Sequence, residues 1–146
     1  MLLEMLAIFC CGTFFGAALY ISLAQHPAAL EAGTSVGGRF FPPMYKRAAP
    51  LQILLAVLGF LGGVLAWWVE SGGLWLVGSI FLISVVPVTL ALIKPINDVL
   101  LSSDNDPDSQ ETQGLLIRWG PKHWIRTIVS GVAFVLYIYA ALTQNV

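Results

Sequence analysis

Residues 74–93 read LWLVGSIFLISVVPVTLALI, an apolar stretch without a single charged side chain. A helix needs about 20 residues of this kind to cross the hydrocarbon core of a bilayer. The rest of the chain agrees, because 58% of its 146 residues are hydrophobic and only 10% are charged. Soluble domains carry about 25% charged residues. The composition therefore predicts an integral membrane protein.

Apolar stretches of this length occur four times, at about residues 2–24, 48–69, 74–93 and 124–142. Segments of this length satisfy their backbone hydrogen bonds inside a bilayer as helices. Proline and glycine lie between the stretches, at residues 27, 72–73, 95 and 120–121, where they are expected to end or begin helices. Residues 1–146 are therefore predicted to form one all-α domain, an integral membrane four-helix bundle.

The positive charges predict how this bundle is oriented. All seven Lys and Arg residues lie in or beside the two long loops, which follow the first and the third span. Basic loops face the cytoplasm, so we expect a multi-pass protein of the plasma or inner membrane with both termini on the non-cytoplasmic side. The net charge of −1 gives no sign of nucleic-acid binding.

The second long loop contains the acidic segment SSDNDPDSQETQ at residues 102–113. A segment with so few apolar residues buries too little surface to fold by itself, so we expect a flexible linker. Its alternating aspartates resemble the start of a calcium loop. However, the glycine and the glutamate that such a loop needs are replaced by Ser109 and Leu115. We therefore predict no calcium site there.

Small residues recur at helical spacing on two spans, with Gly12 and Gly16 on the first and Ala56, Gly59 and Gly63 on the second. Faces of this kind let membrane helices approach closely. We expect them to pack the bundle, and they also offer a surface for a homo-oligomer.

Polar and ionisable side chains gather at the cytoplasmic end of all four spans. An ionisable group in a membrane is costly and usually has a function. The predicted catalytic residues are His26, Asn97, His123 and Arg126, and the predicted ligand contacts are Tyr45, Arg47, Gln52, Thr89, Asp98 and Trp119. Basic and aromatic residues also anchor helices at the interface, which is the simpler interpretation of several of them taken singly.

The surroundings of the two histidines suggest different roles. His123 is the better base, because Lys122 and Arg126 beside it favour its neutral form. His26 ends a span, where the helix dipole favours a cation, so we expect a proton donor or charge holder. Arg126, near the start of the fourth span, is suited to hold a planar anion or to pair with Asp98.

A metal ion shared by His26 and His123, with Asp98 as third ligand, is an alternative. The chain has neither a His-x-x-x-His nor a Glu-x-x-His pattern, and these are the spacings that place two metal ligands on one helix face. We therefore predict no metal and no other cofactor.

Four segments follow one another along the chain: GAALYISLAQHPA (16–28), YKRAAPLQ (45–52), PVTLALIKPINDVL (87–100) and LLIRWGPKHWIR (115–126). Together they resemble the small four-helix membrane family that includes the fungal anthrone oxygenases. The best-matching elements are His26-Pro27, Tyr45-x-Arg47 with Gln52, Pro95-x-Asn97, and Trp119 with His123 and Arg126. The resemblance implies the four-helix fold and, for some members, oxidation of an anthrone.

The resemblance and the polar residues lead to one hypothesis, a membrane-embedded, cofactor-independent oxygenase for a small apolar aromatic substrate that is anthrone- or phenol-like. The methylene of an anthrone is acidic, because its loss of a proton gives an aromatic, phenolate-like anion that reacts with oxygen. His123 would be the base, Arg126 would hold the anion, and Trp119 and Tyr45 would form a flat apolar slot. The partners are then the membrane lipids and this ligand.

The second hypothesis comes from another class of protein. A non-enzymatic membrane module would bind an anionic lipid or a partner subunit at its basic cytoplasmic face. Such a module would use the peripheral Arg39, Lys46, Arg118 and Lys122 and would not need the histidines.

Overall fold

The computed structural model describes residues 1–143, except for the side chain of Glu70, and this range contains helices but no strand. Four helical rods are long and apolar enough to cross a membrane: Leu2–Glu31, Thr34–Val69, Gly73–Leu100 and Gln110–Thr143. The all-α four-helix prediction is therefore confirmed, whereas the sidedness of the termini stays a prediction.

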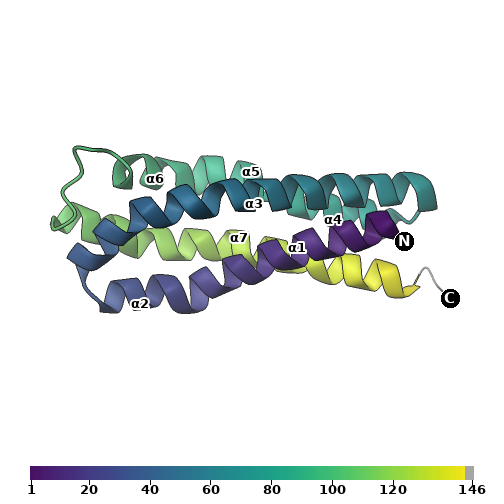
Figure 1. The fold of residues 1–146 in the computed structure, drawn as a ribbon, viewed down its shortest axis with the longest axis horizontal. Helices are drawn as coiled ribbons and strands as arrows, with labels where there is room; N and C mark the ends of the chain where they lie inside the picture. The colour runs from purple at the N-terminus through teal and green to yellow at the C-terminus, as the bar shows by residue number, and fades with distance from the viewer. Residues whose placement is uncertain (144–146) are drawn as a thin grey trace.

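Each rod consists of one or more helical segments that run nearly end to end (Figure 1). The first comprises α1 (Leu2–Tyr20), the π-helical turn η1 (Ile21–Gln25) and α2 (His26–Glu31), and the second is α3 (Thr34–Glu70). The third comprises α4 (Gly73–Ile83), α5 (Val85–Val88), the π-helical turn η2 (Thr89–Ile93) and α6 (Lys94–Leu100), and the fourth is α7 (Gln110–Thr143).

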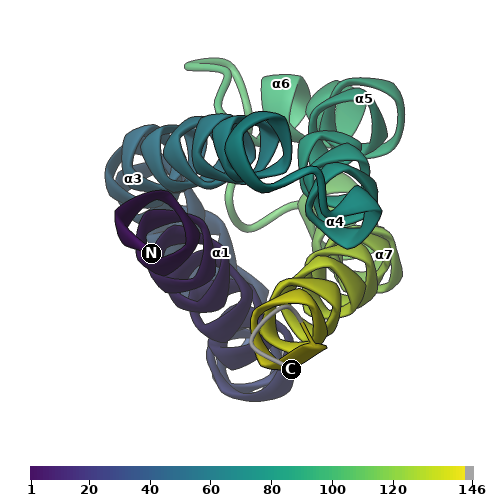
Figure 2. The same cartoon turned by 90° about the vertical axis from the view of Figure 1, so that its right-hand side faces the viewer.

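The four rods close into a ring when viewed along the bundle (Figure 2), in which α1 and α4 each pack against both α3 and α7. The start of α1 and the end of α7 lie at one end, which we call the terminal end (Figure 1). The other end carries α2, the beginning of α3, α6 and the beginning of α7, and we call it the charged end because all seven Lys and Arg residues lie in its half of the rods.

The rods extend further toward the charged end than the apolar stretches suggested. The prolines at 27, 95 and 121 were expected at helix boundaries, but the rods continue through them. A second hydrophobic cluster holds these extensions together. It joins Ile21, Phe41, Ile93, Ile96, Leu100, Leu115, Leu116 and Trp119. The extensions are therefore packed helices rather than loops.

The two π-helical turns explain how the first and third rods pass their prolines. The backbone N–H of His26 bonds to the carbonyl of Ile21, and that of Lys94 bonds to the carbonyl of Thr89, five residues back in each case. Pro27 and Pro95 follow directly. A proline ring collides with the carbonyl four residues before it in a regular α-helix, and the wider π turn relieves this conflict.

The acidic linker is shorter than predicted and is attached to its surroundings. Residues 101–109 are non-helical, and α7 begins at Gln110 because Ser109 Oγ accepts a hydrogen bond from the N–H of Thr112 at 3.1 Å, as an N-cap residue does. The buried Thr112 hydroxyl also lies 2.8 Å from Asn105 Oδ1. These contacts differ from the free linker that the composition suggested.

An ion pair of 2.8 Å between Arg39 and Asp108 joins the linker to α3. A hydrogen bond from Ser35, together with the charge of Arg39, holds the pKa of Asp108 below its usual value. Because the pKa is lowered in the folded state, this contact stabilises the protein at neutral pH, and acidification through that lowered pKa removes its contribution.

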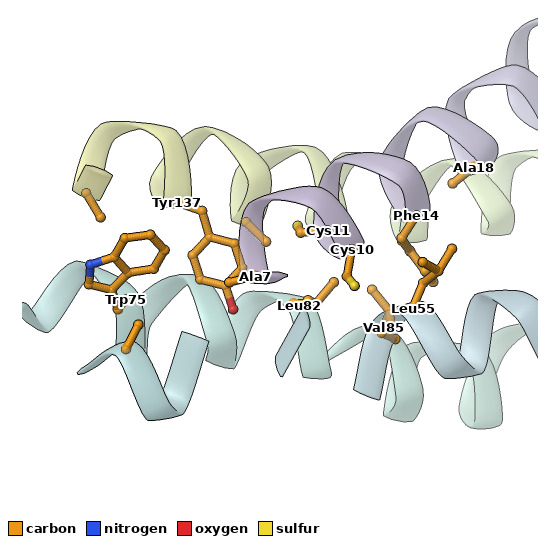
Figure 3. Packing of buried hydrophobic residues seen from close by; sticks show 14 residues of the cluster. Ala7, Cys10, Cys11, Phe14, Ala18, Leu55, Trp75, Leu82, Val85 and Tyr137 are labelled. Carbon is orange, nitrogen blue, oxygen red and sulfur yellow. The ribbon is translucent and has the colours of Figure 1, made fainter. Parts of the chain in front are cut away.

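The terminal half of the bundle has a tightly packed core, in which Trp75 and Tyr137 lie side by side (Figure 3). The Tyr137 hydroxyl donates to the carbonyl of Gly59 at 3.1 Å and lies 2.9 Å from Ser79 Oγ. A side chain at Gly63 would overlap both hydroxyls. The face of α3 that carries these small residues therefore packs inside the bundle. Gly59 and Gly63 are not available for contact with a second copy of the chain.

We predict that Gly63→Ala destabilises the protein by about 1–3 kcal/mol, because its new methyl group must displace the paired hydroxyls of Tyr137 and Ser79. Gly16→Ala is the matched control, since a Cβ there meets no other atom within 4 Å. Thermal unfolding of the purified variants in detergent measures the difference. Equal melting temperatures for the two variants would contradict the close packing at Gly63.

Candidate functional site

A cavity of about 260 Å³ opens between α3, the α5–η2–α6 part of the third rod, and α7. Eight of the ten predicted site residues line it: Tyr45, Gln52, Thr89, Asn97, Asp98, Trp119, His123 and Arg126. Most of the remaining wall is apolar. We had placed this group at the cytoplasmic mouth, but His123 and Arg126 lie well inside α7, because the rods extend beyond them.

His26 and Arg47 do not reach this cavity. The His26 ring lies 5.0 Å from that of Trp119, and its Nε2 lies 2.9 Å from the carbonyl oxygen of Leu116. It faces a separate, smaller pocket of about 20 Å³. Arg47 is exposed on α3. A direct role for His26 on a ligand in the main cavity, and a metal ion shared with His123, therefore do not fit this geometry.

His123 is held by a hydroxyl that the sequence analysis had missed. Its Nδ1 lies 2.9 Å from Ser22 Oγ, which lies 2.9 Å from Thr127 Oγ1. The Thr127 hydroxyl donates to the carbonyl of Ala18 or of His123 at 3.3 Å. Ser22 lies in η1, one helical turn before His26, as a small polar residue in an apolar stretch. A polar residue at that position was the sequence feature that could have identified Ser22 as a partner of His123.

The direction of these hydrogen bonds favours one form of His123. Because the Thr127 hydroxyl donates to a carbonyl, its oxygen is free to accept a proton from Ser22. The Ser22 oxygen then accepts from Nδ1–H of His123. Nε2, which has no partner among the described residues, is left with its lone pair in a residue that lines the cavity. This tautomer is suited to act as a base.

Arg126 has neutral partners instead of the expected acid. Its guanidinium donates to Gln52 Oε1 and, at 3.5 Å, to Thr89 Oγ1, and it lies 4.8 Å from the centre of the Phe14 ring. Thr89 accepts this bond because its own hydroxyl proton goes to the carbonyl of Val85 at 2.7 Å. Thr89 thus donates to a carbonyl in the proline-containing part of the third rod.

The predicted pair between Arg126 and Asp98 is wrong. Asp98 bonds to Lys94 at 2.6 Å, one turn away on the exposed side of α6, where an i, i+4 pair forms at little cost. None of the described carboxylates lies within ion-pair distance of Arg126, and its Nε is buried without a partner. A cation in this position keeps a charge that no carboxylate of the described residues neutralises.

Asn97 supplies a second free donor. It is 2% exposed, and its Oδ1 accepts a hydrogen bond of 2.8 Å from Trp119 Nε1. Its Nδ2 is buried without a partner. Buried donors are rarely left unpaired in a folded protein. The cavity is therefore lined by Asn97 and Arg126, each with one enclosed donor atom that lacks a partner, and by His123, within largely apolar walls.

The sequence model of one protein family, described as anthrone oxygenase, matches residues 41–136. The chain belongs to this family. The matched range contains every residue predicted for the site except His26, and it also excludes Ser22. The family resemblance is thereby confirmed, and three of the four segments that suggested it, at 45–52, 87–100 and 115–126, lie inside the matched range. No curated protein and no solved structure matches the chain.

We predict that Trp119→Phe destabilises the protein by about 1–3 kcal/mol, because it leaves Asn97 Oδ1 buried without its donor. Trp68→Phe, at an exposed position on α3, is the control and should change little. Thermal unfolding in detergent compares the two. Adding Asn97→Leu to Trp119→Phe should recover part of the loss, and a further drop would contradict the hydrogen-bond explanation.

Proposed function

We propose that the protein is a membrane-embedded, cofactor-independent oxygenase that acts on a compact anthrone- or phenol-like aromatic substrate. The observation that carries this proposal is the arrangement of one base and two unpaired donors around a cavity with mainly apolar walls. A cavity of about 260 Å³ is close to the lower limit, about 300 Å³, of small-molecule sites. A compact ring system therefore suits it.

His123 is the general base of the proposed reaction. Its Nε2 removes a proton from the acidic methylene or hydroxyl of the substrate, and the imidazolium that results keeps its bond from Nδ1–H to Ser22. The Ser22–Thr127 chain therefore supports His123 before and after the transfer. A positioned base of this kind contributes about 10²–10⁴-fold in rate.

Arg126 and Asn97 stabilise the anion. Removal of the proton places negative charge on the substrate oxygen. In this proposal Arg126 and Asn97, whose enclosed Nε and Nδ2 atoms lack protein partners, bind that charge. Because both groups are fixed before the reaction and shielded from water, their effect on the developing charge is large. Neither group has to give up a protein partner in order to bind the substrate.

The electron-rich anion then reacts with molecular oxygen. For an anthrone, the methylene carbon loses two hydrogens and gains one oxygen atom, and the second oxygen atom leaves as water. Oxygen is the oxidant, so the equation balances without a bound cofactor. Apolar walls support this step, since oxygen dissolves well in hydrocarbon and the anion is kept away from bulk water.

The alternative function is a lipid- or partner-binding module that uses the charged end. Arg39, Lys46, Arg47 and Arg118 are exposed there, which favours contact with anionic head groups. The two functions differ in the residues that they need. The oxygenase depends on buried groups in the cavity, and the module depends on exposed cations.

We expect His123→Gln to lower oxygen consumption with an anthrone by at least about 10²-fold while the protein stays folded, because the base is lost. An oxygen electrode and quinone absorbance measure turnover by purified protein in lipid nanodiscs. Arg118→Lys, an exposed substitution at the charged end, is the control. The oxygenase proposal fails if the parent protein shows no turnover with anthrone-like phenols or if His123→Gln matches it.

Arg126→Lys tests the anion-binding role. Lysine keeps the positive charge but loses the planar fork that bonds to Gln52 and Thr89 and offers Nε to a ligand. We expect turnover to fall by about 10²-fold, the usual effect of losing one preorganised donor. Arg118→Lys should keep full activity. Equal tolerance of lysine at both positions would mean that Arg126 only anchors α7.

A further inference from the structure

Four residues belong both to the cavity wall and to the outer surface of the bundle. Ile53 and Val57 on α3 are 64% and 41% exposed, and Val86 on α5 and Leu90 on η2 are 42% and 57% exposed. All four line the cavity. They form the rim of a lateral opening between α3 and the third rod, which we call the apolar rim.

The packing of the helices explains why an opening exists here. α3 packs against α4 and again against α6, whereas α5 and η2 between them pack against α7. Pro87 and the π turn η2 also lie in this part of the third rod. Departures from regular helix of this kind redirect a rod. The third rod is therefore separated from α3 beside the cavity, at α5 and η2, and contacts α3 again at α6.

The apolar rim belongs to the part of the bundle that is expected to lie in the hydrocarbon of the bilayer. No charged residue occurs in residues 48–69 of α3 or 74–93 of the third rod, and the rim lies within these stretches. Besides Arg126, the charged lining residues are Lys94 and Asp98, whose 2.6 Å ion pair lies toward the charged end of the cavity. The cavity therefore has an apolar side toward the acyl chains and an ion pair at its polar end.

We propose that the ligand enters this cavity sideways from the bilayer, through the apolar rim, as a membrane-dissolved amphiphile. Its ionisable oxygen lies at Arg126 and Asn97, and its apolar part extends through the rim into the acyl chains. An apolar substituent is favourable there, because CH₂ groups are more stable in hydrocarbon than in water. The ligand class rests on the proposed function, but the route does not.

A thiol inside the cavity tests the route. Ala56 is buried and lines the cavity, so Ala56→Cys, in a Cys10→Ala/Cys11→Ala background, places a reporter there. Uncharged N-phenylmaleimide dissolves in lipid, whereas sulfonatoethyl methanethiosulfonate is charged and stays in water. Rates measured in nanodiscs are divided by those of Ser103→Cys in the exposed linker. We expect the normalised rate of the lipid-soluble reagent to be at least ten times that of the charged one.

Bulky residues at the rim should then close the route. Val57→Trp and Leu90→Trp, on the two sides of the opening, should each slow labelling by N-phenylmaleimide at least tenfold. Val135→Trp is the matched control, an exposed apolar position on α7 outside the cavity wall. Thermal unfolding shows which variants are folded, and Ala49→Cys, another lining position, is the second reporter if Ala56→Cys does not fold.

Three results would overturn the proposal. The first is equal normalised labelling by both reagents, and the second is unchanged labelling in both folded rim variants. The third is faster labelling by the charged reagent after Lys94→Ala, which would place the route at the ion pair. Labelling requires no turnover, so an inactive protein with lipid-side labelling removes the oxygenase function but keeps the route. An active protein that is labelled from the water side keeps the oxygenase function but removes the route through the bilayer.

Discussion

A guanidinium buried among apolar helices without a carboxylate to neutralise it is the constraint on which the site depends. Arg126 on α7 is held by Gln52 from α3, Thr89 from the third rod and the ring of Phe14 from α1. All four rods therefore contribute to keeping one charge in place. Neutral dipoles and a ring face make the cation tolerable but leave its charge uncompensated. In the proposed function, a substrate that becomes anionic supplies the missing negative charge.

The two halves of the bundle divide stability from function. In the terminal half, polar hydroxyls such as those of Ser79 and Tyr137 are paired, and glycines let the helices approach closely. The cavity lies toward the charged end, together with both π turns and the buried donors of Asn97 and Arg126 that lack partners. Departures from ideal packing and hydrogen bonding tend to gather at functional sites. Their concentration in one half is consistent with a site built on a rigid support.

Much of this arrangement could be predicted from the sequence. Apolar stretches gave the four rods, and polar residues at similar depth on different spans gave most of the cavity lining, because such residues turn away from lipid. The ends of the rods could not be predicted, since packing of residues such as Phe41 and Trp119 overrides the usual effect of proline. The partner of Asp98 was missed because two cations, Arg126 on another rod and Lys94 one turn away on the same helix, compete for it. Lys94 forms the ion pair.

The π turn in the first rod explains why Ser22 and His26 were misjudged, and it has a consequence for comparing family members. Regular spacing puts residues four apart on one face, but a π turn takes in one extra residue and rotates all later positions by about 100°. Ser22 therefore bonds to His123, which lines the main cavity, while His26 faces the smaller pocket. A relative lacking one residue between 21 and 25 would be a regular α-helix there. Such a one-residue deletion, small enough to pass for alignment noise, would bring a different set of side chains to His123.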